Sequence, residues 1–392
     1  MLFILLLLLT LLTKIVAVYY GFLALSALKK PKPIPKAVPK TRFACLIAAR
    51  NEEAVIERSV SALLRQDYPQ ELFDVFVIPN NCTDRTSEIA CAAGAQILTC
   101  RKPVHNKGEA LGEAFDILLT RPYDAFCVFD ADNEADAAYL RHMNDAVCAG
   151  ANAAKARVIG REPKRSAVSG CYAVYHSIFN HLFDRGRENL GISAHLVGTG
   201  FLFSRGALEA LGGWHTETMT EDAELAAKCA EAGVHIRYVP EAVTVDEAPD
   251  SFWLSLRQRH RWCAGIQVCA RRYFYSLLRQ FFRSRLAADE FLTLLAPFCQ
   301  ILSLFLTPLT IILCGRVEFL PFLLSTVFSY LGTGLLGSLV LLLRRGFRWR
   351  TAFLFPLFML SWLPLQVAAL LFPPKTWKAI PHGSRKLSKE RV

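Results

Sequence analysis

The chain has 392 residues, of which 53% are hydrophobic, and its 45 Lys and Arg outnumber 34 Asp and Glu to give a net charge of +11. This much apolar material excludes a disordered, collagen-like or small disulfide-stapled protein. The charge raises the question of nucleic acid or anionic lipid. Residues 43–256, however, carry 19 basic and 30 acidic residues, so the long middle segment is acidic. The basic excess lies beside apolar runs, at 29–42, 257–285, 344–350 and 373–392. We therefore expect a lipid bilayer, and no nucleic acid, as a partner.

The first 28 residues predict a transmembrane helix. Leu2 to Leu28 is apolar apart from Lys14 and a few small polar residues, which is long enough to cross a hydrocarbon core of about 30 Å. A cleaved signal peptide is the competing interpretation, but no positive charge precedes the run and several lysines follow it. The positive-inside rule then places the next residues in the cytoplasm. Residues 29–42 are predicted to form a stiff, extended, basic Pro/Lys linker.

Residues 286–373 predict two or three transmembrane or re-entrant helices. The apolar runs are Phe291–Cys314, Phe319–Leu343 and Ala352–Phe372. If the third run spans, the basic tail 374–392 lies outside, against the charge rule. If it re-enters, Pro356 and Pro364 would be tolerated and the tail stays inside. Both alternatives describe a multi-pass protein of the cell membrane with a cytoplasmic body.

The 12 cysteines predict reduced thiols and not a disulfide framework. Eight of them lie within 43–256, and the sequence contains no Cys-x-x-Cys pair and no histidines beside them at metal-ligand spacing. Reduced cysteines packed in the core of a cytosolic domain are the expected explanation.

Residues 43–248 predict a doubly wound α/β domain, because short β-rich runs alternate with helical ones. The predicted strands are Phe43–Ala48, Phe73–Ile78, Ile97–Thr99 and Ala125–Phe129, and the predicted helices cover 52–66, 84–93 and 107–119. Residues 249–285 follow as amphipathic, interfacial helices. In such sheets, ligands bind at the carboxyl ends of the strands, so the residues just after each strand are candidate site residues.

Three polar segments follow predicted strands. Asp130 and Asp132 leave the fourth strand together and would suit a hard divalent cation that also takes phosphate oxygens. Segments 48–53 and 80–84 follow the first and second strands. Each segment taken alone is also typical of a helix cap or a solvated turn.

Two later motifs carry polar groups toward the same region. Asp222 belongs to Thr220-Glu221-Asp222, which precedes a helical run, and a capping box between Thr218 and Glu221 is the structural alternative to catalysis. Segment 258–262 reads Gln-Arg-His-Arg-Trp within a basic, aromatic helix. Its structural alternative is an interfacial helix with snorkelling arginines and a Trp anchor.

Taken together and in this order, these motifs resemble the membrane-embedded family 2 glycosyltransferases. These inverting enzymes include cellulose, hyaluronan, chitin-oligosaccharide and poly-N-acetylglucosamine synthases. The resemblance covers about 42–262 and extends loosely into the later apolar runs. It implies a cytosolic α/β domain of the GT-A type that binds a nucleotide sugar, with Mg or Mn as the cofactor.

The resemblance also implies roles for individual residues. Asp222 would be the catalytic base, and Asp130 and Asp132 would bind the metal. The donor and its diphosphate would contact Ala49, Asn51, Glu52, Asn80, Lys107, Asp130 and Arg261. The acceptor would contact Gly200, Glu221, Gln258 and Trp262. Asn80 departs from the family, which usually has an Asp there in contact with the nucleotide base; an Asn amide can still hydrogen-bond uracil, so a uridine donor stays the expectation.

The expected reaction moves glucose or N-acetylglucosamine from a UDP-sugar to a growing β-linked polysaccharide at the cytoplasmic membrane face. The few membrane spans of one chain do not assure a pore for the polysaccharide, so an oligomer or an export partner would complete that pore. A transferase that adds one sugar to a lipid, similar to ceramide glucosyltransferases, is the alternative. A non-catalytic glycosyltransferase-like membrane subunit is a third interpretation, which the intact motifs argue against.

Overall fold

The structure, a computed structural model, describes residues 2–315, 320, 324, 327, 331–335, 337–339 and 349–374. Its strands are β1 (Phe43–Ala49), β2 (Phe73–Pro79), β3 (Gln96–Ile97), β4 (Ala125–Asp130), β5 (Glu134–Ala135), β6 (Ala153–Gly160), β7 (Phe201–Ser204) and β8 (Ile236–Asp246). Its helices within the α/β domain are α2 (Ile56–Leu64), η1 (Gln70–Leu72), α3 (Thr86–Ala92), α4 (Lys107–Leu118), α5 (Tyr139–Cys148), α6 (Ala167–Ile178), η2 (Phe179–Asp184), α7 (Arg185–Leu190), α8 (Arg205–Ala210) and α9 (Glu221–Ala232). The remaining helices are α1 (Leu2–Ser26), α10 (Phe252–Gln280), α11 (Arg285–Cys314), α13 (Trp349–Leu360) and α14 (Trp362–Leu371).

The strands form one mixed sheet in the order β3-β2-β1-β4-β7-β6-β8-β5. The first four strands in this order are parallel, β7 is antiparallel to both its neighbours, and β5 is antiparallel to β8. The predicted α/β fold is therefore confirmed. Its second half differs from a purely parallel sheet because β7 follows β6 through a long excursion over α6, η2 and α7.

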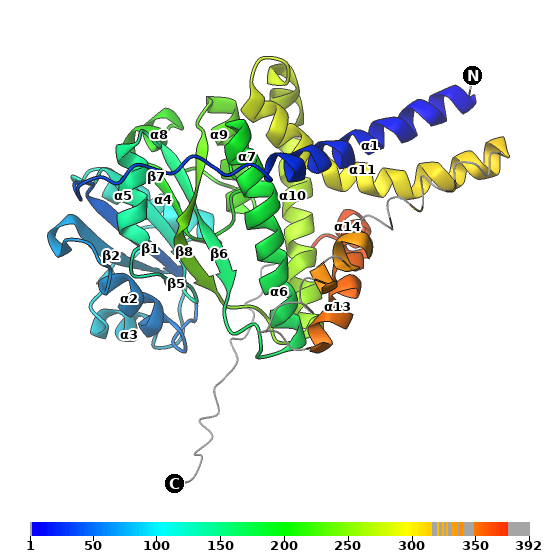
Figure 1. The fold of residues 1–392 in the computed structure, drawn as a ribbon. Helices are drawn as coiled ribbons and strands as arrows, with labels where there is room; N and C mark the ends of the chain where they lie inside the picture. Colours follow the sequence, from blue (N-terminus) through cyan, green and yellow to red (C-terminus); the bar gives the residue numbers. More distant parts are fainter. Residues whose placement is uncertain are drawn as a thin grey trace, which may run out of the picture.

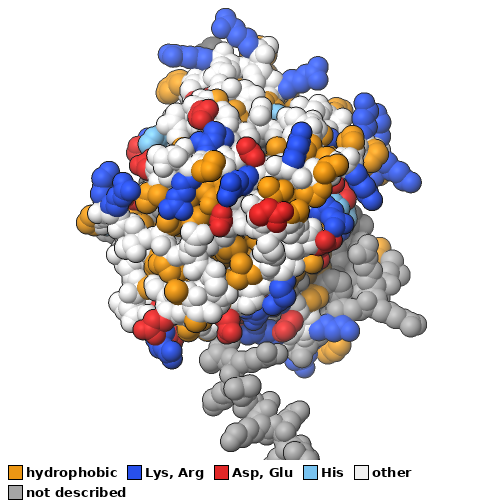
Figure 2. Space-filling view, turned by 90° about the vertical axis from the view of Figure 1, so that its left-hand side faces the viewer, with side chains coloured by type: hydrophobic (Ala, Val, Ile, Leu, Met, Phe, Trp, Pro, Cys, Tyr) orange, Lys and Arg blue, Asp and Glu red, His pale blue; other side chains and the backbone are white. Residues whose placement is uncertain are grey.

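The core lies on both faces of this sheet, since alternate residues of each strand point to opposite faces. In β1, Phe43, Cys45 and Ile47 pack against α2, α3 and α5, whereas Ala44 and Leu46 pack against α4, α8 and α9. The cysteines with described side chains all carry free thiols, as predicted. The face of this domain that Figure 2 shows carries interspersed basic and acidic side chains.

Among the described residues, three helical segments are long and apolar enough to cross a membrane: Phe3–Ser26, Arg285–Leu313 and Trp349–Leu371. Helices α1 and α11 lie side by side and project away from the sheet (Figure 1). Buried Arg187 of α7 connects them to the α/β domain: its Nε lies 3.0 Å from Asp289 Oδ1 on α11, and Asp289 also accepts a hydrogen bond from Tyr19 of α1. The α/β domain therefore packs directly on the pair.

Residues 29–42 contain no helix or strand and run across the domain from α1 to β1 (Figure 1). The backbone N–H of Ala37 donates to Asp145, and those of Lys40 and Thr41 donate to Asn144, so α5 holds the linker in place. This extended course is the one that its Pro/Lys composition favours.

The three apolar runs predicted within 286–373 differ in what the structure shows for each of them. The first corresponds to α11, and most of Phe319–Leu343 lies outside the described residues, as does the tail from residue 375. The third run forms α13 and α14, which break at Ser361. Arg259 of α10 donates to Phe358 O (2.9 Å) and Ser361 Oγ (2.8 Å) at this break. Whether the run spans or re-enters stays a prediction.

Candidate active site

Three neighbouring parallel strands end at one edge of the sheet. Residue Ala48 of β1 is paired in register with Asp130 of β4, and Ala49 is paired with Pro79 of β2. The residues that follow these strands therefore lie together, as the rule for α/β sheets predicts. They line a cavity of about 1170 Å³ that also reaches α9, α10, α1 and α11.

This cavity gathers most of the predicted site residues. Its lining includes Ala49, Glu52, Asn80, Lys107, Asp130, Asp132, Glu221, Asp222, Gln258, Arg261 and Trp262. Asn51 and Gly200 are not among the lining residues. The Asn51 side chain accepts a hydrogen bond from the Thr83 backbone. Gly200 has a φ of +65° and packs on Thr244, where an added Cβ would lie 2.6 Å from Oγ1. A glycine is therefore needed at this position for the backbone conformation and the close packing, and not for contact with a ligand in the cavity.

Lys107 is the central cation of the site. It begins α4, and its Nζ lies 2.6 Å from Asp130 Oδ1 and 2.8 Å from Glu221 Oε1 while donating to the Gly198 carbonyl. Burial alone would lower its pKa, but Asp130 and Glu221 hold the pKa above its ordinary value. The lysine therefore stays charged and links the end of β4 to the start of α9.

Asp222 has the properties of a base near neutral pH. Burial, followed by the negative charge of Glu221, raises its pKa to about 7, against the lowering effects of the Ala223 N–H, Lys107 and Arg261. A base with a pKa near the working pH is the most effective proton acceptor. The chemistry predicted for Asp222 is thus compatible with its surroundings.

The predicted capping box at the start of α9 does not form. Thr218 donates to the Thr220 carbonyl (3.1 Å), and the Glu221 carboxylate turns to Lys107. The backbone N–H groups of Glu217 and Thr218 are instead held by Glu224, at 2.8 and 2.7 Å. The side chain that fixes this loop is therefore Glu224, in the first turn of α9, and not Glu221.

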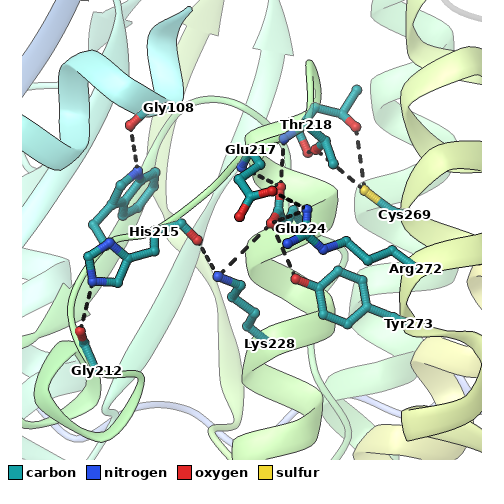
Figure 3. Close-up of polar contacts among 12 residues, drawn as sticks. Gly108, Gly212, His215, Glu217, Thr218, Glu224, Lys228, Cys269, Arg272 and Tyr273 are labelled. Atoms are coloured by element: carbon teal, nitrogen blue, oxygen red, sulfur yellow. Dashed lines mark hydrogen bonds and ion pairs between the residues drawn. The ribbon is translucent and has the colours of Figure 1, made fainter. Parts of the chain in front are cut away.

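Glu224 also joins α9 to α10. Figure 3 shows Tyr273 and Arg272 of α10 reaching its fully buried carboxylate: the Tyr273 hydroxyl donates to Oε1 at 3.2 Å, and Arg272 Nη1 lies 3.9 Å away. Cys269 of α10 lies 3.5 Å from the Thr218 hydroxyl. The loop that precedes Asp222 is consequently positioned by α10.

The Gln-x-x-Arg-Trp residues of α10 contact the same loop and α6. Arg261 Nη1 donates to the Met219 carbonyl (3.2 Å), and Gln258 accepts a hydrogen bond from Tyr172 (2.7 Å). Trp262 packs edge-on against Tyr172. The arginines of this segment do not all extend toward the membrane surface. Arg259 is fully buried, and its guanidinium lies 4.0 Å from the centre of the Phe358 ring. That part of the interfacial-helix interpretation is wrong for Arg259, because it donates to the Phe358 carbonyl and the Ser361 hydroxyl at the α13–α14 break.

The carboxylate side chains that line the cavity are compatible with a divalent cation that a bound substrate also helps to coordinate. The described residues contain no cluster of three or more Asp, Glu, His or Cys side chains that could hold an ion without help. Asp132 and Asp246 both line the cavity, and Asn133 donates to each of them, at 3.1 and 2.8 Å. One or two carboxylates completed by substrate phosphates are the usual arrangement for Mg²⁺. Asp130 pairs with Lys107, and Asp132 also lines the cavity, so both carboxylates are candidate ligands.

Sequence reasoning missed Glu224, Tyr172 and Glu290, a lining residue on α11. None belongs to a recognisable motif. A signal existed for Glu290, since a carboxylate near the start of an apolar run is costly and marks a functional site by default.

A nucleotide-sugar transferase domain of the GT-A type is the class that this sheet, with its polar strand ends, defines. The chain belongs to glycosyltransferase family 2, because the family model described as "Glycosyltransferase like family 2" matches residues 39–265. The mannosyltransferase PcManGT from Pyrobaculum calidifontis, solved with GDP-Man and Mn²⁺, has the same fold: the TM-score is 0.62 over 95% of this chain and 99% of that chain, at 17% identity.

Curated relatives include both lipid and polymer enzymes. "Probable glycosyltransferase YdaM" of Bacillus subtilis is 30% identical over 71% of this chain and 69% of its own length. A beta-monoglucosyldiacylglycerol synthase of Synechocystis is 27% identical over 62% of this chain, and a poly-beta-1,6-N-acetyl-D-glucosamine synthase of Staphylococcus aureus is 24% identical over 60%. The chain spans only 54% and 57% of those two proteins.

Proposed function

We propose that the protein transfers glucose or N-acetylglucosamine from a UDP-sugar to a hydroxyl group of a membrane lipid, with inversion, at the cytoplasmic face. The observation that carries this proposal is the shared cavity, in which the predicted base Asp222 and the Asp130–Lys107 pair are continuous with the walls of α1 and α11. An acceptor held in the bilayer can therefore present its headgroup to the base.

The extent of this cavity favours a lipid over an exported chain. Its lining on α1 runs from Thr13 to Ala24, and its lining on α11 runs from Glu290 to Ser303. No described residue of 2–12 or 304–313, the halves farther from the catalytic body, is among the lining residues. A cavity that ends part-way along both helices suits a headgroup with its acyl chains beside the helices. The similarity to glycolipid synthases supports the same acceptor class.

The proposed reaction needs one base. Asp222 takes the proton of the acceptor hydroxyl while its oxygen attacks the anomeric carbon, the bond from that carbon to the diphosphate breaks, and UDP leaves. An α-linked donor then gives a β-linked product, because a single displacement inverts the centre. Lys107 and Arg261 would face the charge that develops on the diphosphate. Mg or Mn, held by Asp132 with a contribution from Asp130, would supply further positive charge to the leaving group.

The nucleotide proposal depends on Asn80. This side chain is buried at the end of β2, and its Oδ1 accepts a hydrogen bond from Asn81 at 3.0 Å. Its amide N–H groups are then the groups that face a base carbonyl, in place of the carboxylate that is usual in the family. Uracil offers such carbonyls, so we keep UDP as the proposed nucleotide, and comparing the binding of UDP with that of GDP tests it.

A growing polysaccharide, the acceptor that the sequence favours, is the second candidate. Polar side chains at the deep end of the cavity support it: Lys14 donates to Ser303 at 2.8 Å, and Gln366 donates to Gln300 at 2.7 Å. Such groups inside a membrane mark pathways for polar substrates. Similarity to poly-N-acetylglucosamine and cellulose synthases supports this candidate as well.

The deciding experiment follows the product. The full chain in lipid nanodiscs is incubated with radiolabelled UDP-glucose or UDP-N-acetylglucosamine and Mg or Mn, and UDP release is measured in parallel. We expect a product that partitions into chloroform and carries one sugar. A water-soluble product of high molecular mass would overturn the lipid acceptor and establish the second candidate.

A further inference from the structure

Glu290 is a buried carboxyl group in the part of the cavity that α1 and α11 line. It lies on α11, is 9% exposed and contributes to the cavity lining. Among the described residues, none donates a hydrogen bond to it or forms an ion pair with it. Its neighbour Asp289 has the opposite environment, since Arg187 and Tyr19 both contact its carboxylate. Adjacent helical residues point about 100° apart, so α11 turns Asp289 to the catalytic body and Glu290 to the cavity.

The position of Glu290 relates it to the predicted base. Ala226 lines the cavity one helical turn after Asp222, a rise of about 6 Å along α9. Leu294, one turn after Glu290, packs with Ala223 of α9 in one apolar cluster. The two carboxyl groups thus lie on facing helices of the same cavity.

We propose that Glu290 is an acceptor-binding residue, whose carboxyl group forms a hydrogen bond with a second hydroxyl of the lipid headgroup. The acceptor is then a lipid with at least two hydroxyl groups, one attacked and one bound, such as a glycosylated glycerolipid. This inference rests on the proposed lipid acceptor. A lipid with a single hydroxyl has no group to offer Glu290.

The burial of Glu290 favours acceptors that have a second hydroxyl over acceptors that lack it. A buried carboxyl group loses its hydrogen bonds to water unless a ligand replaces them. Leaving such a group unpaired costs enough to discriminate about tenfold between otherwise similar ligands. A site built to bind a hydroxyl rejects an analogue that lacks it, because the buried group stays unpaired.

The test compares two acceptors in phosphatidylcholine nanodiscs: diacylglycerol, with one hydroxyl, and glucosyldiacylglycerol, with several. For the wild type we expect kcat/KM about tenfold or more higher with glucosyldiacylglycerol. Glu290→Ala should abolish this advantage, so that kcat/KM becomes similar for the two acceptors, and Glu290→Gln should keep part of it. Leu302→Ala, at a 42% exposed position on α11 outside the cavity, is the matched control and should behave as wild type.

The outcomes separate this inference from the proposed function. If the wild type glycosylates lipids but shows no preference for the second hydroxyl, or if Glu290→Ala keeps the preference, the role of Glu290 is overturned and the lipid acceptor stands. An equal loss of kcat/KM with both acceptors in Glu290→Ala would also overturn the role of Glu290, because a general disturbance of the structure has that effect. If the wild type makes only polymer, the lipid acceptor itself fails, and the inference fails with it.

Discussion

The donor side of the cavity lies at the ends of β1, β2 and β4, whereas the acceptor side lies where α9, α10, α11 and α1 meet. On the donor side, the side chains sit within a few residues of a strand end, and the Lys107–Asp130–Glu221 contacts connect them. On the acceptor side, the positions depend on packing between helices. Gly265 of α10 shows how close that packing is: a Cβ there would lie 2.2 Å from Thr220 Cγ2.

This difference implies that variants on the two sides of the cavity should change different kinetic quantities. Variants on the donor side should change donor affinity and metal dependence, because those groups face the diphosphate. Variants in the α9–α10 contacts should change the transfer rate and leave donor affinity intact, because they reposition Asp222. Four measurements test whether the two sides separate in this way.

The largest effect should follow Asp222→Asn. Loss of the base should lower the rate of transfer by about 10²–10⁴-fold, while donor binding measured by calorimetry changes little. Transfer is followed with radiolabelled donor in nanodiscs. A variant that keeps metal-dependent transfer near the wild-type rate would remove Asp222 from the proposed mechanism, and with it the assignment of α9 to the acceptor side.

Metal removal tests the donor side. Chelation with EDTA should lower transfer by about 100-fold or more, because several kcal/mol of charge stabilisation is lost, and added Mg or Mn should restore it. Asp132→Asn should need a higher metal concentration for half-maximal rate. Asp250→Asn, at an exposed position outside the cavity lining, is the control. Full activity after chelation would contradict the proposed cofactor.

The pH dependence should report the pKa of Asp222, which is about 7. Because the base acts in its deprotonated form, kcat/KM should fall about tenfold for each pH unit below 7 and level off above it. Lys107→Gln removes a cation that lowers this pKa, so the inflection should move upward. A profile with no inflection between pH 6 and 8 would show that another group accepts the proton.

A smaller effect should follow Tyr273→Phe. It removes one hydrogen bond to buried Glu224, which is worth about 1 kcal/mol, so the transfer rate should fall several-fold with donor KM unchanged. Tyr275→Phe is the matched control, since Tyr275 is 73% exposed on the same helix. An equal change in donor KM and rate would show that the two sides of the cavity are not separable.

The sequence predicts the donor side well because its signals are local. Short, β-rich apolar runs locate β1, β2 and β4 to within one or two residues, and their parallel order follows from the intervening helices. The acidic and amide residues after each strand then have to meet at one edge. Lys107 could be placed near the donor by its motif, but its two carboxylate partners could not, since they are 23 and 114 positions away in the chain.

The acceptor side could not be predicted in the same way. Glu224 holds a loop beside Asp222 through contacts with α10, about 50 residues later, and no spacing encodes that pairing. Arg259 reads as a snorkelling arginine, yet the break between α13 and α14 gives it buried acceptors. In both cases the partner comes from a distant helix.

By itself, the sequence determined the acidic α/β body, the apolar runs beside basic stretches and the motifs of family 2, because composition and periodicity are properties of short segments. Only the tertiary structure decided that one cavity joins the strand ends to the inner halves of α1 and α11, and that Glu290 faces this cavity while Asp289 faces Arg187. The physical reason is that the direction of a buried charge depends on which helices pack around it, and that packing involves residues far apart in the chain.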